Sequence, residues 1–237
     1  MYRSWCARSI YVDNWFNSLT KIVREYGITR PAAILDQLNT EVIRSLLQRG
    51  EKAINDGMDL SLIAYNKKEG KLEFAGAYNP LIIVRNGEAV TIKADRFPIG
   101  MEYSMDRKFT NQEIEVQSGD LLYMFSDGFA DQFGGPDCKK FKVGNLKNAF
   151  AEIYNRSMDE QKDYLEQLLD WMGDQQQVDD ILIIEPGFHR SDACQFNSLF
   201  ATVAVGGDHL HGLAWCSCHA PQVTVVGPDK PCVRGDP

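Results

Sequence analysis

The order of hydrophobic patterns along the 237-residue chain predicts an α+β fold built on antiparallel sheets. Residues 15–26 and 31–48 place apolar side chains three and four positions apart, which is typical of amphipathic helices. Residues 58–93 and 109–128 alternate in hydrophobicity between turn residues, which is the pattern of strands. Helical spacing returns over about 143–172, and a short apolar run follows at 181–184. Helices, strands, helices and one strand, without repeated βαβ units, favour a layered antiparallel domain.

The two N-terminal helices are expected to form a hairpin. Gly27 ends the first helix, and Pro31 suits the first turn of the second, where a missing backbone N–H costs nothing. The apolar stripe of the second helix continues to about Gln48.

The strands are expected as short runs separated by turns. Asn86-Gly87 lies between two apolar runs, which is a strong signal for a two-residue hairpin. Ser118-Gly119-Asp120 joins two further strands, the second of which contains "LLYMF". The first four expected strands are Leu60–Tyr65, Lys71–Gly76, Leu81–Arg85 and Val90–Lys93.

The second helical region and the last strand have clear boundaries. Ser157 and Glu160 form a capping-box pair at the start of a helix expected to reach Met172. The run Ile181–Ile184 is expected as the last strand and is ended by Pro186.

Composition excludes several classes of function. The net charge of −8 argues against general binding to nucleic acid or to anionic membranes, since both need a basic surface. No apolar stretch approaches the roughly 18–20 residues of a membrane-spanning helix. The N-terminal segment lacks the apolar core of a signal peptide, so we expect a soluble, cytoplasmic protein.

Acidic residues stand at the ends of two apolar strands. Asp127 follows "LLYMF" and precedes Gly128, and Asp179-Asp180 precede "ILII". Carboxylates at adjoining strand ends can bind Mg²⁺ or Mn²⁺, which prefer oxygen ligands, but such acids can equally cap a segment or be solvated. Adjacent residues point to opposite sides of a strand, so only one of Asp179 and Asp180 can face a shared site.

Four sequence blocks, taken in order, resemble a known enzyme family. The blocks "AGAYNPLIIVRNGE", "FPIGM", "GDLLYMFSDGFADQFGG" and "QVDDILII" are similar to those of the PPM-type (type 2C) metal-dependent serine/threonine phosphatases, specifically the bacterial SpoIIE-like branch. The resemblance implies a domain over 15–187 with a four-layer α-β-β-α sandwich. It also implies two Mn²⁺ or Mg²⁺ ions, whose activated water attacks phosphoserine or phosphothreonine. By resemblance, Asp127 and Asp179 are metal ligands. Asp180 then either contacts a ligand without touching the metal or has a structural role.

The chain departs from the family pattern at its N-terminus. The early aspartate-bearing strand and the Asp-x-x-Gly-His-Gly-type turn are not found, and Asp13 is the only acid in the atypical segment 1–14. The sequence therefore predicts a sandwich that is incomplete at the N-terminus, corresponding to the C-terminal two-thirds of a phosphatase domain. Because Asp127 and Asp179 alone cannot ligate two ions, weak or absent activity is expected.

The segment 188–237 differs in character from the rest of the chain. It holds every histidine of the protein and little periodic patterning, so we expect a loop-rich, poorly ordered tail in which "FATVAV" can form a strand. Zinc binding by the tail is an alternative, although the ligand spacing does not match usual zinc sites. The residues concerned are His209, His211, Cys216, Cys218 and His219.

Two functions remain in view. The first is a protein serine/threonine phosphatase that acts on a phosphorylated regulatory protein in bacterial signalling, under an upstream sensor. The alternative is a non-catalytic module on the same sandwich that binds a partner protein through the helical hairpin. Whichever function applies, we expect structural roles for two of the blocks: "AGAYNP" forms a turn where backbone layers approach closely, and "FPIG" buries Phe97 and Ile99.

Overall fold

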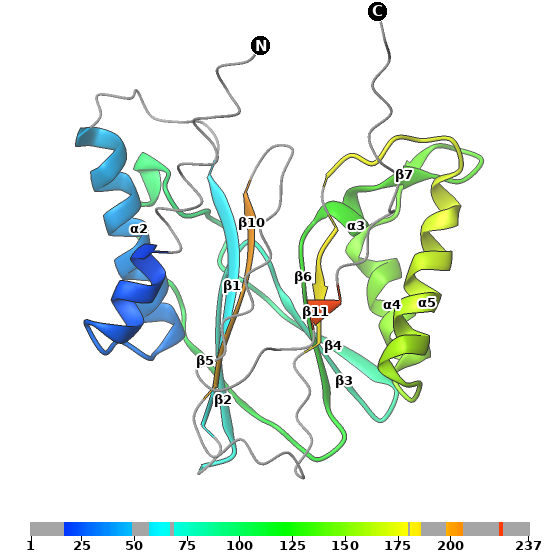
Figure 1. Cartoon of the computed structure of the whole chain (residues 1–237), viewed down its shortest axis with the longest axis horizontal. Coiled ribbons are helices and arrows are strands. Elements are labelled where there is room, and N and C mark those ends of the chain that lie inside the picture. The colour runs from blue at the N-terminus through cyan, green and yellow to red at the C-terminus, as the bar shows by residue number, and fades with distance from the viewer. Residues whose placement is uncertain are drawn as a thin grey trace, which may run out of the picture.

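Two antiparallel sheets pack face to face, and helices cover the outer face of each (Figure 1). The computed structural model describes residues 17–48, 57–66, 69–179 and 181–185, together with the backbone of two strands at 198–205 and 223–224. The predicted α+β sandwich of antiparallel sheets is confirmed.

The first sheet has four strands and the second has five. The first sheet, in spatial order, contains β10 (Ser198–Val205), β1 (Met58–Asn66), β2 (Lys71–Ala77) and β5 (Gln112–Glu115). The second contains β11 (Val223–Thr224), β9 (Ile183–Ile184), β6 (Leu121–Phe125), β3 (Leu81–Arg85) and β4 (Glu88–Ile92). The chain changes sheet between β2 and β3, between β4 and β5 and between β5 and β6, and it does so again on either side of β10.

The helices form the two outer layers. A helix over 17–24 and α2 (Pro31–Gln48) cover the first sheet, whereas α4 (Val143–Ile153) and α5 (Met158–Leu169) cover the second (Figure 1). Shorter elements complete the chain: η1 (Glu102–Ser104), α3 (Gly128–Asp131), β7 (Phe133–Gly134), β8 (Lys139–Lys140) and η2 (Asp170–Met172). No helix among the described residues is long and apolar enough to cross a membrane.

Alternation of side chains along each strand divides the core into three layers. In β1, Leu60 and Leu62 pack toward α2, whereas Ile63 packs between the sheets. In β6, Tyr123 and Phe125 pack toward α4 and α5, and their neighbours face the first sheet. The Tyr123 and Phe150 rings stack with centroids 4.0 Å apart, and the Tyr123 hydroxyl donates to Gln161 at 2.7 Å. Polar residues that share the inward face of a strand therefore point into the space between the sheets.

The observed boundaries confirm most of the expected elements and correct others. The second helix, β3 and the capping box of Ser157 with Glu160 appear as predicted. The last strand is shorter than Ile181–Ile184, because the Leu182 N–H donates to the Ser126 hydroxyl rather than to a backbone carbonyl. The helix expected to reach Met172 ends at Leu169 and tightens into η2. Sequence patterns did not indicate α3, η1 or the β7–β8 hairpin, which are too short to show a period.

The connection between β2 and β3 is a tight turn in which backbone atoms approach closely, as predicted. A Cβ at Gly76 would lie 2.6 Å from the Asn79 carbonyl oxygen, so only glycine fits. Asn79 is buried, and Tyr78 has a positive φ of 59°. The "FPIG" block also behaves as expected, with Phe97 and Ile99 buried against α2.

Two strands come from the segment 188–237. β10 contains the run "FATVAV" and pairs with β1 over eight residues, from Ser198 opposite Tyr65 to Val205 opposite Met58. β11 pairs with β9. The histidines and cysteines of the zinc alternative lie outside the described residues, as does Asp13.

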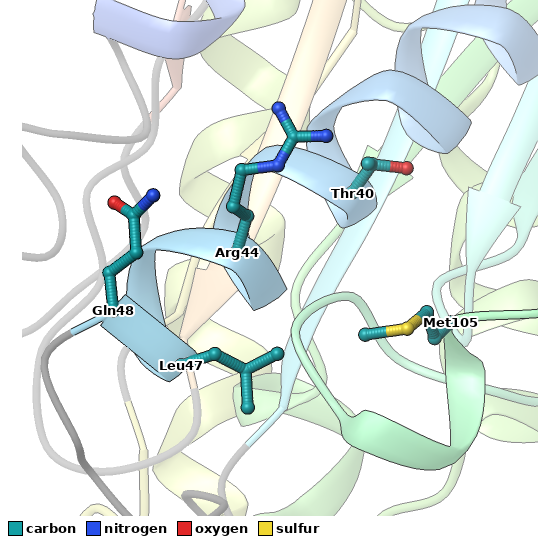
Figure 2. Close-up of a pocket in the computed structure, with 5 residues that line it drawn as sticks. All are labelled: Thr40, Arg44, Leu47, Gln48 and Met105. Carbon is teal, nitrogen blue, oxygen red and sulfur yellow. The ribbon is translucent and has the colours of Figure 1, made fainter.

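A cavity of about 390 Å³ lies between α2 and the η1 segment (Figure 2). Two of its lining residues, Leu47 and Met105, are exposed apolar side chains. The lining residues are Thr40, Arg44, Leu47, Gln48 and Met105.

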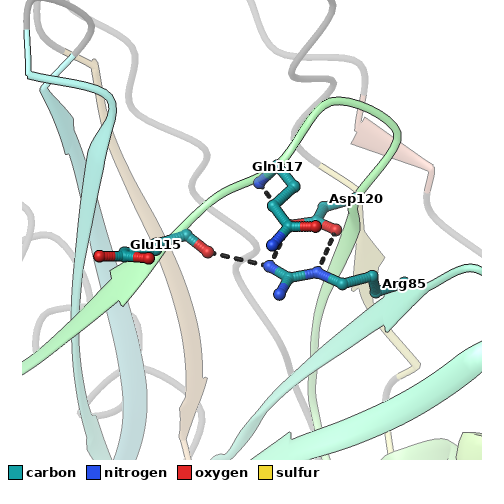
Figure 3. Close-up of polar contacts among 4 residues, drawn as sticks. All are labelled: Arg85, Glu115, Gln117 and Asp120. Carbon is teal, nitrogen blue, oxygen red and sulfur yellow. Dashed lines mark hydrogen bonds and ion pairs between the residues drawn. The ribbon is translucent and has the colours of Figure 1, made fainter.

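A bidentate ion pair secures the crossing from β5 to β6 (Figure 3). Arg85 Nε and Nη2 donate to the two carboxylate oxygens of Asp120 at 2.8 and 2.7 Å, and Nη2 also donates to the Glu115 carbonyl at 2.9 Å. The Asp120 side chain is 1% exposed. Burial alone would raise the pKa of Asp120, but hydrogen bonds from Arg85 and the Gln117 backbone, with the Arg85 charge, outweigh it and lower that pKa.

Arg85→Met is expected to lower the free energy of unfolding by about 1–3 kcal/mol at neutral pH, because it leaves the buried Asp120 carboxylate without its cation. The partial exposure of Arg85 keeps the loss below that of a fully buried pair. The folded-state pKa of Asp120 lies below the ordinary value of 3.8. The ion pair therefore stabilises the fold above pH 3.8, and this stabilisation is lost as the pH falls through the folded-state pKa of Asp120. Urea titrations at neutral and acidic pH measure this difference. A deficit that stays constant into strong acid would contradict it.

Candidate metal centre

Asp127 lies at the end of β6, where the strand turns into α3. The Ser126 N–H donates to the Leu182 carbonyl at 2.9 Å, and the Leu182 N–H donates to Ser126 Oγ at 2.9 Å. These bonds hold the ends of β6 and β9 side by side. Asp127 follows with helical φ and ψ, and its side chain makes no capping hydrogen bond to α3. Its carboxylate accepts a hydrogen bond from its own backbone N–H, which leaves acceptor positions for another group.

Asp59 on β1 lies across the sandwich from Asp127. Leu60 and Leu62 face α2, so alternation turns Asp59 toward the space between the sheets. The two carboxylates are close enough for the Asp127 charge to act on Asp59. Both stand at the end where the β2–β3 connection crosses between sheets, because Leu60 pairs with Ala77 and Leu81 pairs with Met124.

Ionising both carboxyl groups of the Asp59–Asp127 pair is unfavourable in the metal-free protein. Burial and then repulsion by Asp127 raise the pKa of Asp59 to about 7. The pKa of Asp127 is also raised, first by burial and then by the charge of Asp131, although Lys140 opposes this. The repulsion raises the pKa of Asp59 and not that of Asp127, because Asp127 loses its proton first and is already charged when Asp59 ionises. A cation between the carboxylates would relieve this repulsion.

Asp179 lies at the same end of the second sheet. Buried Gln132, which follows α3, donates from Nε2 to the Gln176 carbonyl at 3.0 Å and accepts from the Val178 N–H at 3.1 Å. These bonds fix the segment that carries Asp179 beside α3. The Asp179 carbonyl accepts from Gln177 Nε2 at 2.8 Å. Asp180 lies outside the described residues.

The donor chemistry at this edge fits a hard divalent cation, since the facing groups are carboxylates. The number of donors is smaller than two ions require. Within the described ranges, no three or more His, Cys, Asp or Glu side chains converge as a metal-binding group. The structure thus brings Asp127 together with Asp59, which sequence reasoning missed, and places Asp179 nearby without joining it to them. The signal for Asp59 was an acid on the inward face of an otherwise apolar strand.

The sequence matches the family of stage II sporulation protein E (SpoIIE) over residues 14–186. The chain belongs to the SpoIIE family. The predicted resemblance to PPM-type phosphatases is therefore confirmed. No curated protein matches the sequence.

Solved PP2C phosphatase domains share the fold. The SiaA PP2C domain of Pseudomonas aeruginosa is 26% identical, with a TM-score of 0.64, and the match covers 73% of this chain and 67% of that one. The PP2C domain and regulatory-domain fragment of SpoIIE from Bacillus subtilis is 18% identical, with a TM-score of 0.54, and the match covers 73% of this chain and 48% of that one. The RsbU and RsbW domains of Rv1364c from Mycobacterium tuberculosis are 17% identical, with a TM-score of 0.54, and the match covers 69% of this chain and 44% of that one. The chain therefore spans less than half of the latter two.

Proposed function

We propose that this SpoIIE-family domain is a protein phosphatase that hydrolyses phosphoserine or phosphothreonine on a regulatory protein with the help of bound Mn²⁺ or Mg²⁺. The observation that carries the proposal is the facing pair of carboxylates, Asp59 and Asp127, at one edge of the sandwich. Perturbed acids in such a position are a common mark of functional sites.

In this proposal Asp127 and Asp179 hold the metal, as the family resemblance implies, and Asp59 adds a third carboxylate. Bound Mn²⁺ or Mg²⁺ supplies a lowered water pKa and neutralisation of the phosphoryl oxygens. Asp59 and Asp127 would hold the cation, and the buried layer beneath them excludes bulk water from that side. Because Mg²⁺ prefers six oxygen ligands, three carboxylates give a weak site, and full occupancy by two ions is not expected from these residues alone.

Hydrolysis of an aryl phosphate by the whole chain tests the proposal. We expect slow turnover that rises with Mn²⁺ concentration and is abolished by a chelator. Asp137→Asn is a matched control, since Asp137 is an exposed acid paired with Lys139 and its loss is expected to leave the rate unchanged. A rate that is indifferent to the chelator would overturn the proposal.

The second candidate is a non-catalytic module that binds a partner protein through the helical hairpin. The cavity between α2 and η1 favours it, because the exposed Leu47 and Met105 that line it offer apolar contacts (Figure 2). Absence of both Mn²⁺ binding and hydrolysis in a folded chain would favour this candidate. The upstream sensor and the cytoplasmic location stay predictions of either proposal.

A further inference from the structure

Two exposed tyrosines stand beside the carboxylate pair. Tyr78, in the β2–β3 connection, is 47% exposed, and Tyr103, in η1, is 52% exposed. The Tyr103 hydroxyl is hydrogen-bonded to the Tyr78 side chain and interacts electrostatically with Asp59. Tyr103 therefore lies close enough to Asp59 for the two side chains to interact, with Tyr78 next to it.

The side chain of Arg107 lies over the rings of Tyr103 and Phe97. The Arg107 guanidinium lies 5.6 Å from the centroid of the Tyr103 ring and 5.3 Å from that of Phe97, both within cation–π range. Among the described residues, no carboxylate forms an ion pair with Arg107, although acids are numerous in this chain. The aromatic faces orient the guanidinium without neutralising it.

The loop that carries this group is held by a buried polar network. Asn39 of α2 donates from Nδ2 to the Ser104 carbonyl at 2.9 Å, and its Oδ1 accepts from the Gly100 N–H at 2.9 Å and from Ser104 Oγ at 3.1 Å. Asn39 and Ser104 are 2% and 0% exposed. A satisfied buried network of this kind fixes backbone geometry, so Tyr103 and Arg107 are positioned before any ligand arrives.

We propose that Arg107, supported by Tyr103 and Tyr78, binds the phosphoryl group of the phosphoserine or phosphothreonine segment and positions it at the Asp59–Asp127 edge. Guanidinium groups bind phosphate through paired, charge-assisted hydrogen bonds, and among the described residues Arg107 has no carboxylate partner that would compete for them. The exposed tyrosines supply contact area for the flanking peptide. This inference rests on the proposed function for its ligand, but it makes a separate claim about binding.

Binding of a peptide that carries a non-hydrolysable phosphonate analogue of phosphoserine, measured by fluorescence anisotropy with Mn²⁺ present, tests the inference. The wild-type chain is expected to prefer the phosphonate peptide over the same peptide with serine. Arg107→Gln is expected to reduce that preference about tenfold, as the loss of one charge-assisted phosphate contact does. Tyr103→Phe, which retains the ring beneath the guanidinium, is expected to keep most of it.

Lys108→Gln is the matched control, because Lys108 is the next residue along the same loop and pairs with Asp36 on α2. It removes the same charge and is expected to leave the preference intact. Equal binding of the phosphonate peptide by wild type and Arg107→Gln would overturn the inference, as would an equal loss in Lys108→Gln or no preference in the wild type. Hydrolysis of the aryl phosphate is measured in parallel. An Arg107-dependent preference without hydrolysis would uphold the inference while the proposed function fails.

Discussion

Asp127→Asn is expected to lower Mn²⁺-dependent hydrolysis by at least about 100-fold, since loss of a direct ligand exceeds the 10- to 100-fold cost of losing a residue that only supports one. Asparagine preserves the size of the side chain but offers one neutral oxygen in place of a charged carboxylate. The fold is expected to survive, because the Asp127 side chain does not cap α3 and its carboxylate is penalised by burial.

The measurement is kcat/KM for an aryl phosphate at saturating Mn²⁺, with circular dichroism to establish that each variant is folded. Asp137→Asn again serves as the exposed-acid control. If Asp127→Asn retained wild-type kcat/KM, Asp127 would have no role at the metal, and the assignment would fail.

Asp59→Asn is expected to stabilise the metal-free protein by about 1–3 kcal/mol at about pH 8, while weakening Mn²⁺ binding. The folded-state pKa of Asp59 is about 7, well above the 3.8 of an unperturbed aspartate. Between these values the folded chain keeps a proton that the unfolded chain has lost, so the wild type loses stability as pH rises from 3.8 toward 7. Asparagine carries no such proton, and the variant avoids the loss.

Thermal or urea unfolding at about pH 4 and about pH 8, in the presence of a chelator, shows whether Asp59→Asn is more or less stable than the wild type. The two proteins are expected to be similarly stable in acid and to diverge as pH rises. Added Mn²⁺ is expected to stabilise the wild type more than the variant, since only the wild type presents both carboxylates. A variant that is less stable than the wild type at the higher pH would contradict the repulsion between Asp59 and Asp127.

Sequence patterns located the elements better than they located the site. The long periodic stretch at Pro31–Gln48 and the five apolar residues Leu121–Phe125 gave correct bounds, because burial of one face leaves a plain period. The division of the strands into two sheets required the family resemblance, since alternation shows that a strand is half-buried but not which strand lies beside it.

The sequence indicated one member of the facing carboxylate pair and not the other. Asp127 stood out because a carboxylate followed a buried strand and preceded a glycine. Asp59 did not, since its partner lies 68 positions away in the sequence and only the packing of the two sheets brings the pair together. Arg107 and Tyr103 were missed for the same reason. Their common position depends on Asn39, which reaches from α2 to hold the η1 loop.

A metal centre between the two sheets is tested most directly by a calorimetric titration of Mn²⁺ into the wild-type chain, Asp59→Asn and Asp127→Asn at about pH 8, where Asp59 is ionised. We predict saturable binding to the wild type and at least about tenfold weaker binding to each variant, with Asp137→Asn unchanged. Equal Mn²⁺ affinity in the wild type and both site variants would contradict a metal centre between the two sheets.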